Sequence, residues 1–267
     1  MTMFSLDCLT LPDVTPVDLF AVAADAGYSS VSLWVQPPVL YPPMLAEPGM
    51  APALKQAIAG SGVQLGNLEV FNLNTDAPIA DFERVIAFGA DLGARSATAI
   101  NFGGPRADMA ERLAAFHALC SGYGLAALLE PISMGATRTV QEGAALAQEA
   151  GVDVRIVVDC LHVMRTGTTP ESLARIPADR IGYIQLCDGP AVIAAEEIGP
   201  ESVANRLYPG EGEFPLVAYL QALPAGVPLG VETPNQARLD QGMSPLARAR
   251  AAFAAAQAVC LEAGVAS

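Results

Sequence analysis

Eight short apolar segments, separated by Ala-rich segments, constrain the fold of this chain more than any other feature. The segments have strand length and are rich in Val, Ile, Leu or aromatic residues, at positions 4–9, 30–35, 64–71, 96–102, 125–130, 154–159, 181–186 and 228–232. Between them, segments such as 82–92 and 111–120 carry apolar residues at helical spacing. Strands that alternate with helices pair in parallel through crossover connections. About eight such units in 267 residues predict an α/β protein with the (β/α)8 architecture of a TIM barrel.

The main alternative is a doubly wound open sheet, which commonly has a glycine-rich turn after its first strand. Here the segment that follows the first strand is CLTLPDVTP, and neither GxGxxG nor GxxxxGK[ST] occurs in the chain. No linker is visible. The sequence therefore favours a closed barrel and one domain over residues 1–267.

Helix ends are well marked. Thr15, Thr169 and Ser244 each place a hydroxyl directly before a proline, a pattern typical of an N-cap followed by the first helical turn. Gly264 is expected to end the last helix.

Composition and charge narrow the class of partner. Hydrophobic residues make up 52% of the chain and charged residues 16%, which indicates a large core. The formal net charge is −14, which argues against binding to nucleic acid or to an anionic membrane. The amino terminus lacks the basic region and apolar stretch of a secretory signal, and the five cysteines form no CxxC pair. We expect a cytoplasmic protein with reduced thiols and a small-molecule ligand.

Four of the later apolar segments end in an acidic or amide residue. These are Glu130 after LAALL, Asp159 after VRIVV, Gln185 after IGYI and Glu232 after PLGV. Carboxylates are poor strand formers, so their recurrence at segment ends suggests a shared site. The carboxyl ends of barrel strands meet at one mouth, where these oxygens can hold a divalent cation.

The motifs in the second half of the chain follow a recognisable order. They are LLEP at 128–131, VVDCLH at 157–162, YIQLCDGP at 183–190, RLYPGEGEFPL at 206–216 and GVETP at 230–234. This order resembles the xylose isomerase-like TIM barrel superfamily, to which sugar phosphate isomerases and epimerases belong. In the first half, the resemblance rests on the rhythm of strands and helices.

The resemblance implies a metal site. Carried over, Glu130, Asp159, Gln185 and Glu232 are the ligands of a divalent ion. Gln185 departs from the pattern, because many isomerases of this superfamily have histidine there. Since an amide oxygen is a harder ligand than imidazole, the site favours Mn or Mg, with Co or Zn as alternatives.

Four further residues are candidate substrate ligands. His162 lies three residues after Asp159, where the superfamily often places a histidine that contacts substrate oxygen; support of the metal carboxylates is its other candidate role. Arg206 is either a clamp for a substrate group or part of a surface salt bridge. Asp188 either binds substrate or pairs with Arg206. Trp34 is either an apolar wall under the ligand or ordinary packing.

The implied chemistry is proton transfer next to a carbonyl group. The metal polarises the carbonyl, Glu130 and Glu232 act as the acid-base pair, and an enediolate forms. This predicts an isomerase or epimerase of an unphosphorylated sugar or related hydroxy-carbonyl compound. By the same analogy, such barrels often form homo-oligomers.

Two alternatives remain. One is a dehydratase of a cyclic keto acid resembling 3-dehydroshikimate dehydratase, some members of which also carry glutamine at the position of Gln185. Certain of those enzymes have a basic histidine shortly after the first metal glutamate, whereas this chain has Glu130-Pro131-Ile132-Ser133. The other is a barrel that binds a sugar or keto acid without turning it over. The DNA-binding endonuclease IV branch is disfavoured, because it uses a histidine-rich three-zinc site and this acidic chain has two histidines.

Overall fold

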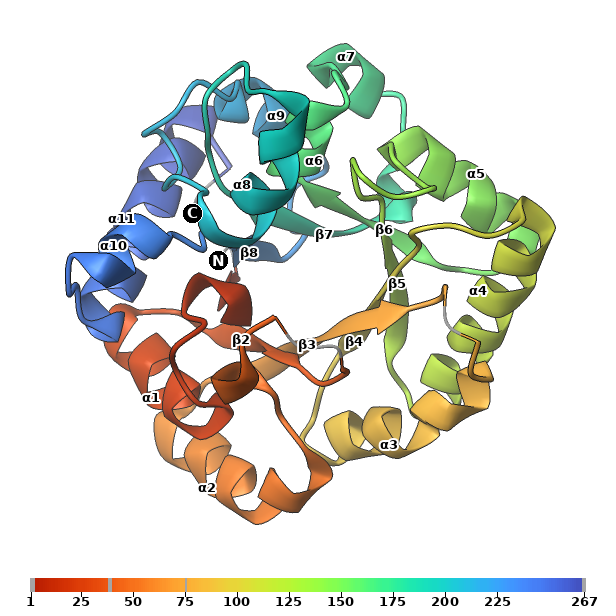
Figure 1. Cartoon of the computed structure of the whole chain (residues 1–267), viewed down its shortest axis with the longest axis horizontal. Helices are drawn as coiled ribbons and strands as arrows, with labels where there is room; N and C mark the ends of the chain where they lie inside the picture. Colours follow the sequence, from red (N-terminus) through yellow and green to blue (C-terminus); the bar gives the residue numbers. More distant parts are fainter. Residues whose placement is uncertain (1–2, 38–39, 75, 266–267) are drawn as a thin grey trace.

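A computed structural model describes residues 3–37, 40–74 and 76–265. It shows a closed barrel of eight parallel strands in chain order, as predicted (Figure 1). The barrel closes where β1 pairs with β8, with Phe4 opposite Leu229 and Leu6 opposite Val231. The strands are β1 (Phe4–Leu6), β2 (Ser30–Trp34), β3 (Gln64–Asn72), β4 (Ser96–Ile100), β5 (Ala126–Glu130), β6 (Arg155–Asp159), β7 (Ile181–Leu186) and β8 (Leu229–Val231).

Helices surround the barrel, as the view along its axis shows (Figure 1). They are α1 (Pro16–Ala26), α2 (Ala51–Ser61), α3 (Glu83–Asp91), α4 (Arg106–Gly122), α5 (Val140–Ala150), α6 (Cys160–Arg165), α7 (Pro170–Leu173), α8 (Ile198–Ala204), α9 (Leu216–Ala222), α10 (Gln236–Asp240) and α11 (Pro245–Ala263). Short 3-10 helices are η1 (Cys8–Thr10), η2 (Pro42–Met44), η3 (Pro48–Met50), η4 (Ile79–Phe82), η5 (Ala178–Arg180) and η6 (Ala195–Glu197). Within the described ranges, no helix is long and apolar enough to cross a membrane.

All eight predicted strands are present, but three were predicted at least two residues too long, among them 228–232, of which only Leu229–Val231 is a strand. The segment 4–9 ends as a strand at Leu6, because the carbonyl of Asp7 accepts from the amide of Thr10 and the residues between them turn into η1. The segment 96–102 ends at Ile100. The first correction matters for the site, since it places Asp7 at the mouth of the barrel rather than inside a strand.

The predicted helix ends are confirmed. The hydroxyls of Thr15, Thr169 and Ser244 accept hydrogen bonds from backbone amides three residues later, which satisfies donors that the first helical turn leaves free. Gly264 ends α11 with a φ of 73°, in the left-handed region that favours glycine.

The interior of the barrel explains how the site is supported. Leu128, Val157 and Tyr183, on β5, β6 and β7, form a buried apolar cluster. Side chains alternate between the two faces of a strand, so the residue two positions later on each strand also points inward. Those residues are Glu130, Asp159 and Gln185, and the apolar cluster lies one layer beneath them.

Candidate metal and substrate site

The register of the barrel brings the predicted strand-end residues to one mouth. Asp159, the last residue of β6, pairs with Gln185 on β7, and Gln185 pairs with Gly230 on β8. Glu130 is the last residue of β5, and Glu232 directly follows β8. All four predicted ligands are nearly inaccessible to solvent. They therefore line the carboxyl ends of four consecutive strands.

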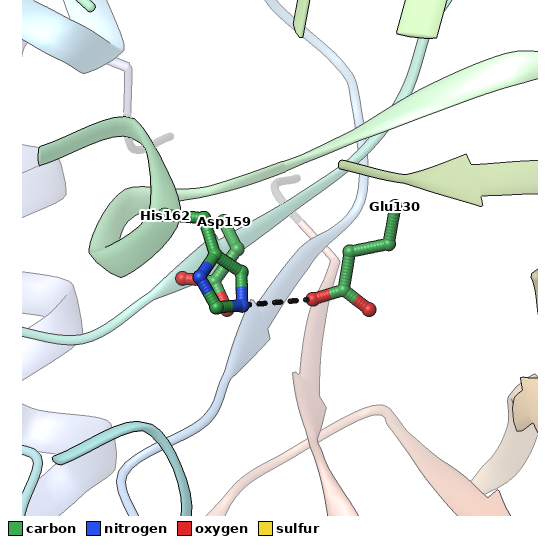
Figure 2. Close-up of side chains that lie close together, drawn as sticks. All are labelled: Glu130, Asp159 and His162. Carbon is green, nitrogen blue, oxygen red and sulfur yellow. Dashed lines mark ion pairs between the residues drawn. The ribbon is translucent and has the colours of Figure 1, made fainter. Parts of the chain in front are cut away.

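Glu130, Asp159 and His162 form one compact group (Figure 2). One ligand atom from each lies within 4.8 Å of the others. The junction of β6 and α6 sets this geometry, because Asp159 Oδ1 accepts from the backbone amide of Leu161 at 2.7 Å and so caps α6. His162 follows in the first turn of that helix, and its ring projects back toward the two carboxyl groups.

His162 is held as a neutral imidazole. Its Nδ1 lies 3.0 Å from Ser133 Oγ, and its Nε2 lies 3.7 Å from Glu130 Oε1 and 3.9 Å from Asp159 Oδ2. Burial lowers the pKa of His162 to about 4, although the nearby Asp159 carboxylate opposes this shift. At neutral pH the contact drawn in Figure 2 therefore joins a carboxyl group to an uncharged ring.

Arg206 bridges two of the predicted metal ligands. Its Nη1 lies 2.9 Å from Asp159 Oδ2 and its Nη2 lies 3.0 Å from Glu232 Oε2, while Nε donates to the carbonyl of Ser202 at 2.8 Å. Arg206 is 2% exposed, so the alternative of a surface salt bridge was wrong. This burial was not predictable from local sequence, because the acidic partners of Arg206 lie 47 and 26 residues away along the chain.

The guanidinium divides the carboxyl groups into two kinds. Burial acts to raise the pKa of Asp159, but Arg206, His162 and the amide of Leu161 outweigh it, and the net pKa is lowered. Burial together with the neighbouring Asp159 and Glu232 raises the pKa of Glu130 well above its usual range. Burial raises the pKa of Glu232 to about 8, against the opposing effect of Arg206. The single positive charge of Arg206 therefore keeps Asp159 ionised but does not suffice to keep Glu130 and Glu232 ionised as well.

Gln185 has one free end. Its Nε2 donates to Asp7 Oδ2 at 3.3 Å, whereas its Oε1 is buried and accepts no hydrogen bond from any residue that the structure describes. A buried acceptor without a partner is costly, and native structures normally satisfy it. A buried oxygen without a donor, in a site whose carboxyl groups have raised pKa values, suits a divalent cation, so the donor set of these residues fits such a metal.

Asp7 and Glu69 were not singled out from the sequence. Together with Glu232 they form a second group of carboxyl oxygens within 4.8 Å of one another. Asp7 follows FSL just as Glu130 follows LAALL, so the same strand-end pattern marks it. Glu69 lies within β3 and accepts from Ser32 Oγ and Asn67 Nδ2, each at 3.0 Å.

A cavity of about 220 Å³ opens at this mouth. Its polar lining includes Glu69, Glu130, His162, Arg206 and Glu232. The walls are mostly apolar: Leu9, Trp34, Pro37, Leu40, Val70, Ile100, Phe102, Ile132, Met134 and Val203. The cavity therefore has one polar side, at the strand ends, and apolar surfaces around it.

Two predicted substrate ligands have different surroundings. Trp34 lines the cavity and donates from Nε1 to the carbonyl of Gln36 at 2.7 Å, which suits the apolar wall considered for it. Asp188 is not among the lining residues. Its carboxylate accepts from the backbone amides of Gly189, Gly210 and Phe214 at 2.8 to 3.0 Å, so its contacts stabilise the loop after β7.

Comparison with known proteins agrees with the geometry. A family model described as xylose isomerase-like TIM barrel matches residues 20–257, and the chain belongs to that family. Among curated protein sequences, none matches this chain.

Solved structures with the same fold are numerous and distant in sequence. A xylose isomerase-like TIM barrel/4-hydroxyphenylpyruvate dioxygenase fusion protein has a TM-score of 0.81 and 18% identity over 100% of this chain, which spans 45% of the fusion protein. The IOLI protein with a zinc atom has a TM-score of 0.81 and 15% identity, covering 97% of this chain and 98% of that one. An L-ribulose 3-epimerase has a TM-score of 0.74 and 15% identity, covering 99% and 96%. At these identities the similarity establishes the fold alone.

Proposed function

We propose that this protein is a divalent-metal-dependent isomerase or epimerase of a sugar or related hydroxy-carbonyl compound. One observation carries the proposal: Glu130 and Glu232, both with raised pKa values, line the same cavity as the neutral His162. Family membership and the resemblance to an L-ribulose 3-epimerase support it.

Glu130, Asp159, Gln185 and Glu232 are the residues that would hold the metal. Their oxygen donors suit hard cations, so Mg or Mn is favoured over Co or Zn, although the zinc in the related IOLI structure keeps zinc among the candidates. A bound divalent ion supplies Lewis-acid polarisation of the substrate carbonyl and favours the ionised form of nearby carboxyl groups.

The two glutamates would move the proton. A general acid or base works best when its pKa lies near the working pH. Burial raises the pKa of Glu232 to about 8 in the metal-free site, and a bound cation would lower it again. Glu130 and Glu232 come from β5 and β8, so they approach a ligand in the cavity from different sides of the barrel mouth. One glutamate would remove the proton from the carbon next to the carbonyl. In epimerisation the other glutamate would return a proton to the opposite face of that same carbon. In isomerisation a proton would be returned to the former carbonyl carbon, while the neighbouring hydroxyl group passes its proton to the former carbonyl oxygen.

The remaining polar groups would bind and orient the substrate. The ring of His162 offers a hydrogen bond to a substrate hydroxyl group, with its orientation fixed by Ser133. Arg206 holds Asp159 and Glu232 in position. Trp34 and the other apolar side chains exclude water from the reacting carbon.

A substrate screen in D₂O tests this proposal. Ketoses, aldoses and cyclic hydroxy ketones are incubated with the protein and Mn²⁺ or Mg²⁺, and deuterium uptake at carbon is followed by NMR. Metal-dependent exchange that requires both Glu130 and Glu232 is the expected result. Protein that binds neither metal, or exchange that persists in excess chelator, contradicts the proposal.

The apolar walls favour a second candidate, a dehydratase of a cyclic keto acid. Ile100, Phe102, Ile132 and Met134 present few groups that could bind the hydroxyls of a sugar but suit the face of a ring. Glu130 is followed by Pro131-Ile132-Ser133, without the basic histidine of certain such dehydratases, which keeps this candidate second. Loss of water from a cyclic hydroxy keto acid, seen as a new ultraviolet absorbance, distinguishes the two reactions. A binding protein without catalysis would retain its ligand but show neither result.

A further inference from the structure

Asp7 connects β1 to the proposed metal site across the barrel closure. Its side chain is completely buried and accepts two hydrogen bonds. Tyr183 donates its hydroxyl proton to Oδ1 at 2.6 Å, and Gln185 donates from Nε2 to Oδ2 at 3.3 Å. Tyr183 and Gln185 lie two residues apart on β7 and therefore on the same, inward face, so Asp7 contacts two successive inward side chains of that strand.

Gly230 on β8 provides the room for these contacts. A Cβ atom added at Gly230 would lie 2.6 Å from the hydroxyl oxygen of Tyr183 and closer still to Asp7 Oδ2. Both positions are well inside contact distance. The absence of a side chain on β8 therefore allows Asp7 to reach across from β1 to β7.

A glutamine ligand has an orientation problem that a carboxylate or imidazole ligand does not have. Its amide has one end with an acceptor oxygen and one with a donor NH₂ group, and rotation of the amide exchanges them. Only the oxygen can bind a hard cation. A carboxylate such as that of Asp7 attracts the NH₂ end and repels the oxygen, which matches the observed contact and the free Oε1 of Gln185.

We propose that Asp7 is a positioning residue that fixes the amide of Gln185 so that its oxygen is presented to the metal. This inference rests on the proposed metal site. The Asp7 carboxylate acts through Gln185 and does not itself bind the ion. Its role is to accept from Nε2 and so exclude the flipped amide, in which the NH₂ group would face the cation.

Metal affinity in a set of variants tests the role of Asp7. Asp7→Ala and Asp7→Asn remove the same charge, but asparagine keeps a carbonyl oxygen that can accept from Nε2. Each is made with Gln185 present and with Gln185→Glu, whose two carboxylate oxygens are equivalent. Glu69→Gln is the matched control, because it replaces a carboxyl group of the same acidic cluster, and none of the hydrogen bonds described for Glu69 involves Gln185. The dissociation constant for Mn²⁺ is measured by titration calorimetry.

With Gln185 present, we expect Asp7→Ala to weaken Mn²⁺ binding about 10-fold to 100-fold, the usual effect of losing a group that orients a ligand. The loss of Mn²⁺ affinity in Asp7→Asn and in Glu69→Gln should be several-fold smaller than in Asp7→Ala. With Gln185→Glu, neither change at Asp7 should weaken binding, because both ends of the side chain are then oxygens. Equal effects of Asp7→Ala and Asp7→Asn, or an equal loss in both backgrounds, overturn the inference. A wild-type protein that binds no metal instead overturns the proposed function.

A measurement on the wild-type protein covers the case in which Asp7→Ala does not fold. In protein labelled with ¹⁵N-glutamine, the side-chain NH₂ signals of Gln185 are assigned by their loss in Gln185→Glu. With Mg²⁺ bound, these protons should exchange slowly with solvent because Asp7 holds them. Rapid exchange in the Mg²⁺ complex contradicts the inference.

Discussion

Arg206 and Asp159 are joined inside the barrel mouth by a contact of 2.9 Å between Nη1 and Oδ2, with both side chains almost fully buried. The contact with Arg206 helps to lower the pKa of Asp159, whereas burial, only partly offset by Arg206, raises the pKa values of Glu130 and Glu232. Since Arg206 also contacts Glu232, one guanidinium balances part of the negative charge that a metal would otherwise have to balance alone.

Removal of Arg206 should destabilise the metal-free protein. Breaking a buried ion pair by deleting one partner typically costs about 3 to 5 kcal/mol, because the other charge is left uncompensated. We expect Arg206→Met to lower the free energy of unfolding by that amount in excess chelator, measured with urea, and by less in excess Mn²⁺. Arg238→Met, which breaks a more exposed pair with Glu211, is the control and should cost much less. Equal losses in the two variants would show that the Arg206 contacts contribute no more than a surface pair.

Metal removal should lower the melting temperature. A ligand that binds only the folded state adds RT ln(1 + [L]/Kd), which is about 2.7 kcal/mol at a concentration a hundred times Kd. Differential scanning calorimetry of chelated protein with and without added Mn²⁺ or Mg²⁺ measures this effect. An unchanged melting temperature, together with no metal in elemental analysis, would remove the metalloenzyme proposal.

The identity of residue 185 should control metal preference. The neutral amide oxygen of Gln185 favours hard cations, whereas an imidazole nitrogen binds Zn²⁺ and Co²⁺ well. Gln185→His should therefore strengthen Zn²⁺ or Co²⁺ binding relative to Mg²⁺ in competition titrations. The same preference in both proteins would mean that residue 185 does not contact the ion.

The acid-base pair should be separable from metal binding. Glu130→Gln and Glu232→Gln keep a coordinating oxygen but cannot accept a proton, so each should abolish substrate-dependent deuterium uptake while metal is retained. His162→Ala should weaken substrate binding or slow turnover only partially. Wild-type exchange rates in both glutamine variants would rule out the proposed pair.

The stability of the metal-free protein should fall as pH rises from about 6.5 to 8. Burial raises the pKa of Asp7 to about 7 and that of Glu232 to about 8. A carboxyl group with a raised pKa keeps a proton in the folded state that the unfolded chain has already released. The stability that this group contributes is therefore lost as pH rises through its folded pKa. The pKa of His162 is lowered from 6.5 to about 4, so its effect makes the folded state more stable as pH rises from about 4 to 6.5. Above pH 6.5 His162 contributes no further change in stability.

Thermal melts in chelator at pH 6.5, 7 and 8 measure this slope. Glu232→Gln should flatten it, because the variant has no proton to lose at that position. A wild-type melting temperature that is constant or rises across this window would contradict the raised pKa values.

The candidate site was predictable only in part, because a local sequence pattern does not show which residues distant in the chain come into contact. Glu130, Asp159 and Glu232 stand out because each interrupts an apolar pattern locally. Asp7 obeys the same rule but follows a strand of only three residues, so its signal is weak. Arg206 lies in a loop, where charged residues are common and carry little information about burial.

The sequence by itself determined the eight strands, the helix ends and the polar residues at strand ends, because side-chain shape, capping and alternation act between residues close in the chain. Tertiary structure alone decided which of those polar groups meet. The contact of Gln185 with Asp7 joins residues 178 apart, and that of Arg206 with Asp159 joins residues 47 apart. Such contacts depend on the register with which β8 closes onto β1 and on the space left at Gly230, and no local pattern encodes either.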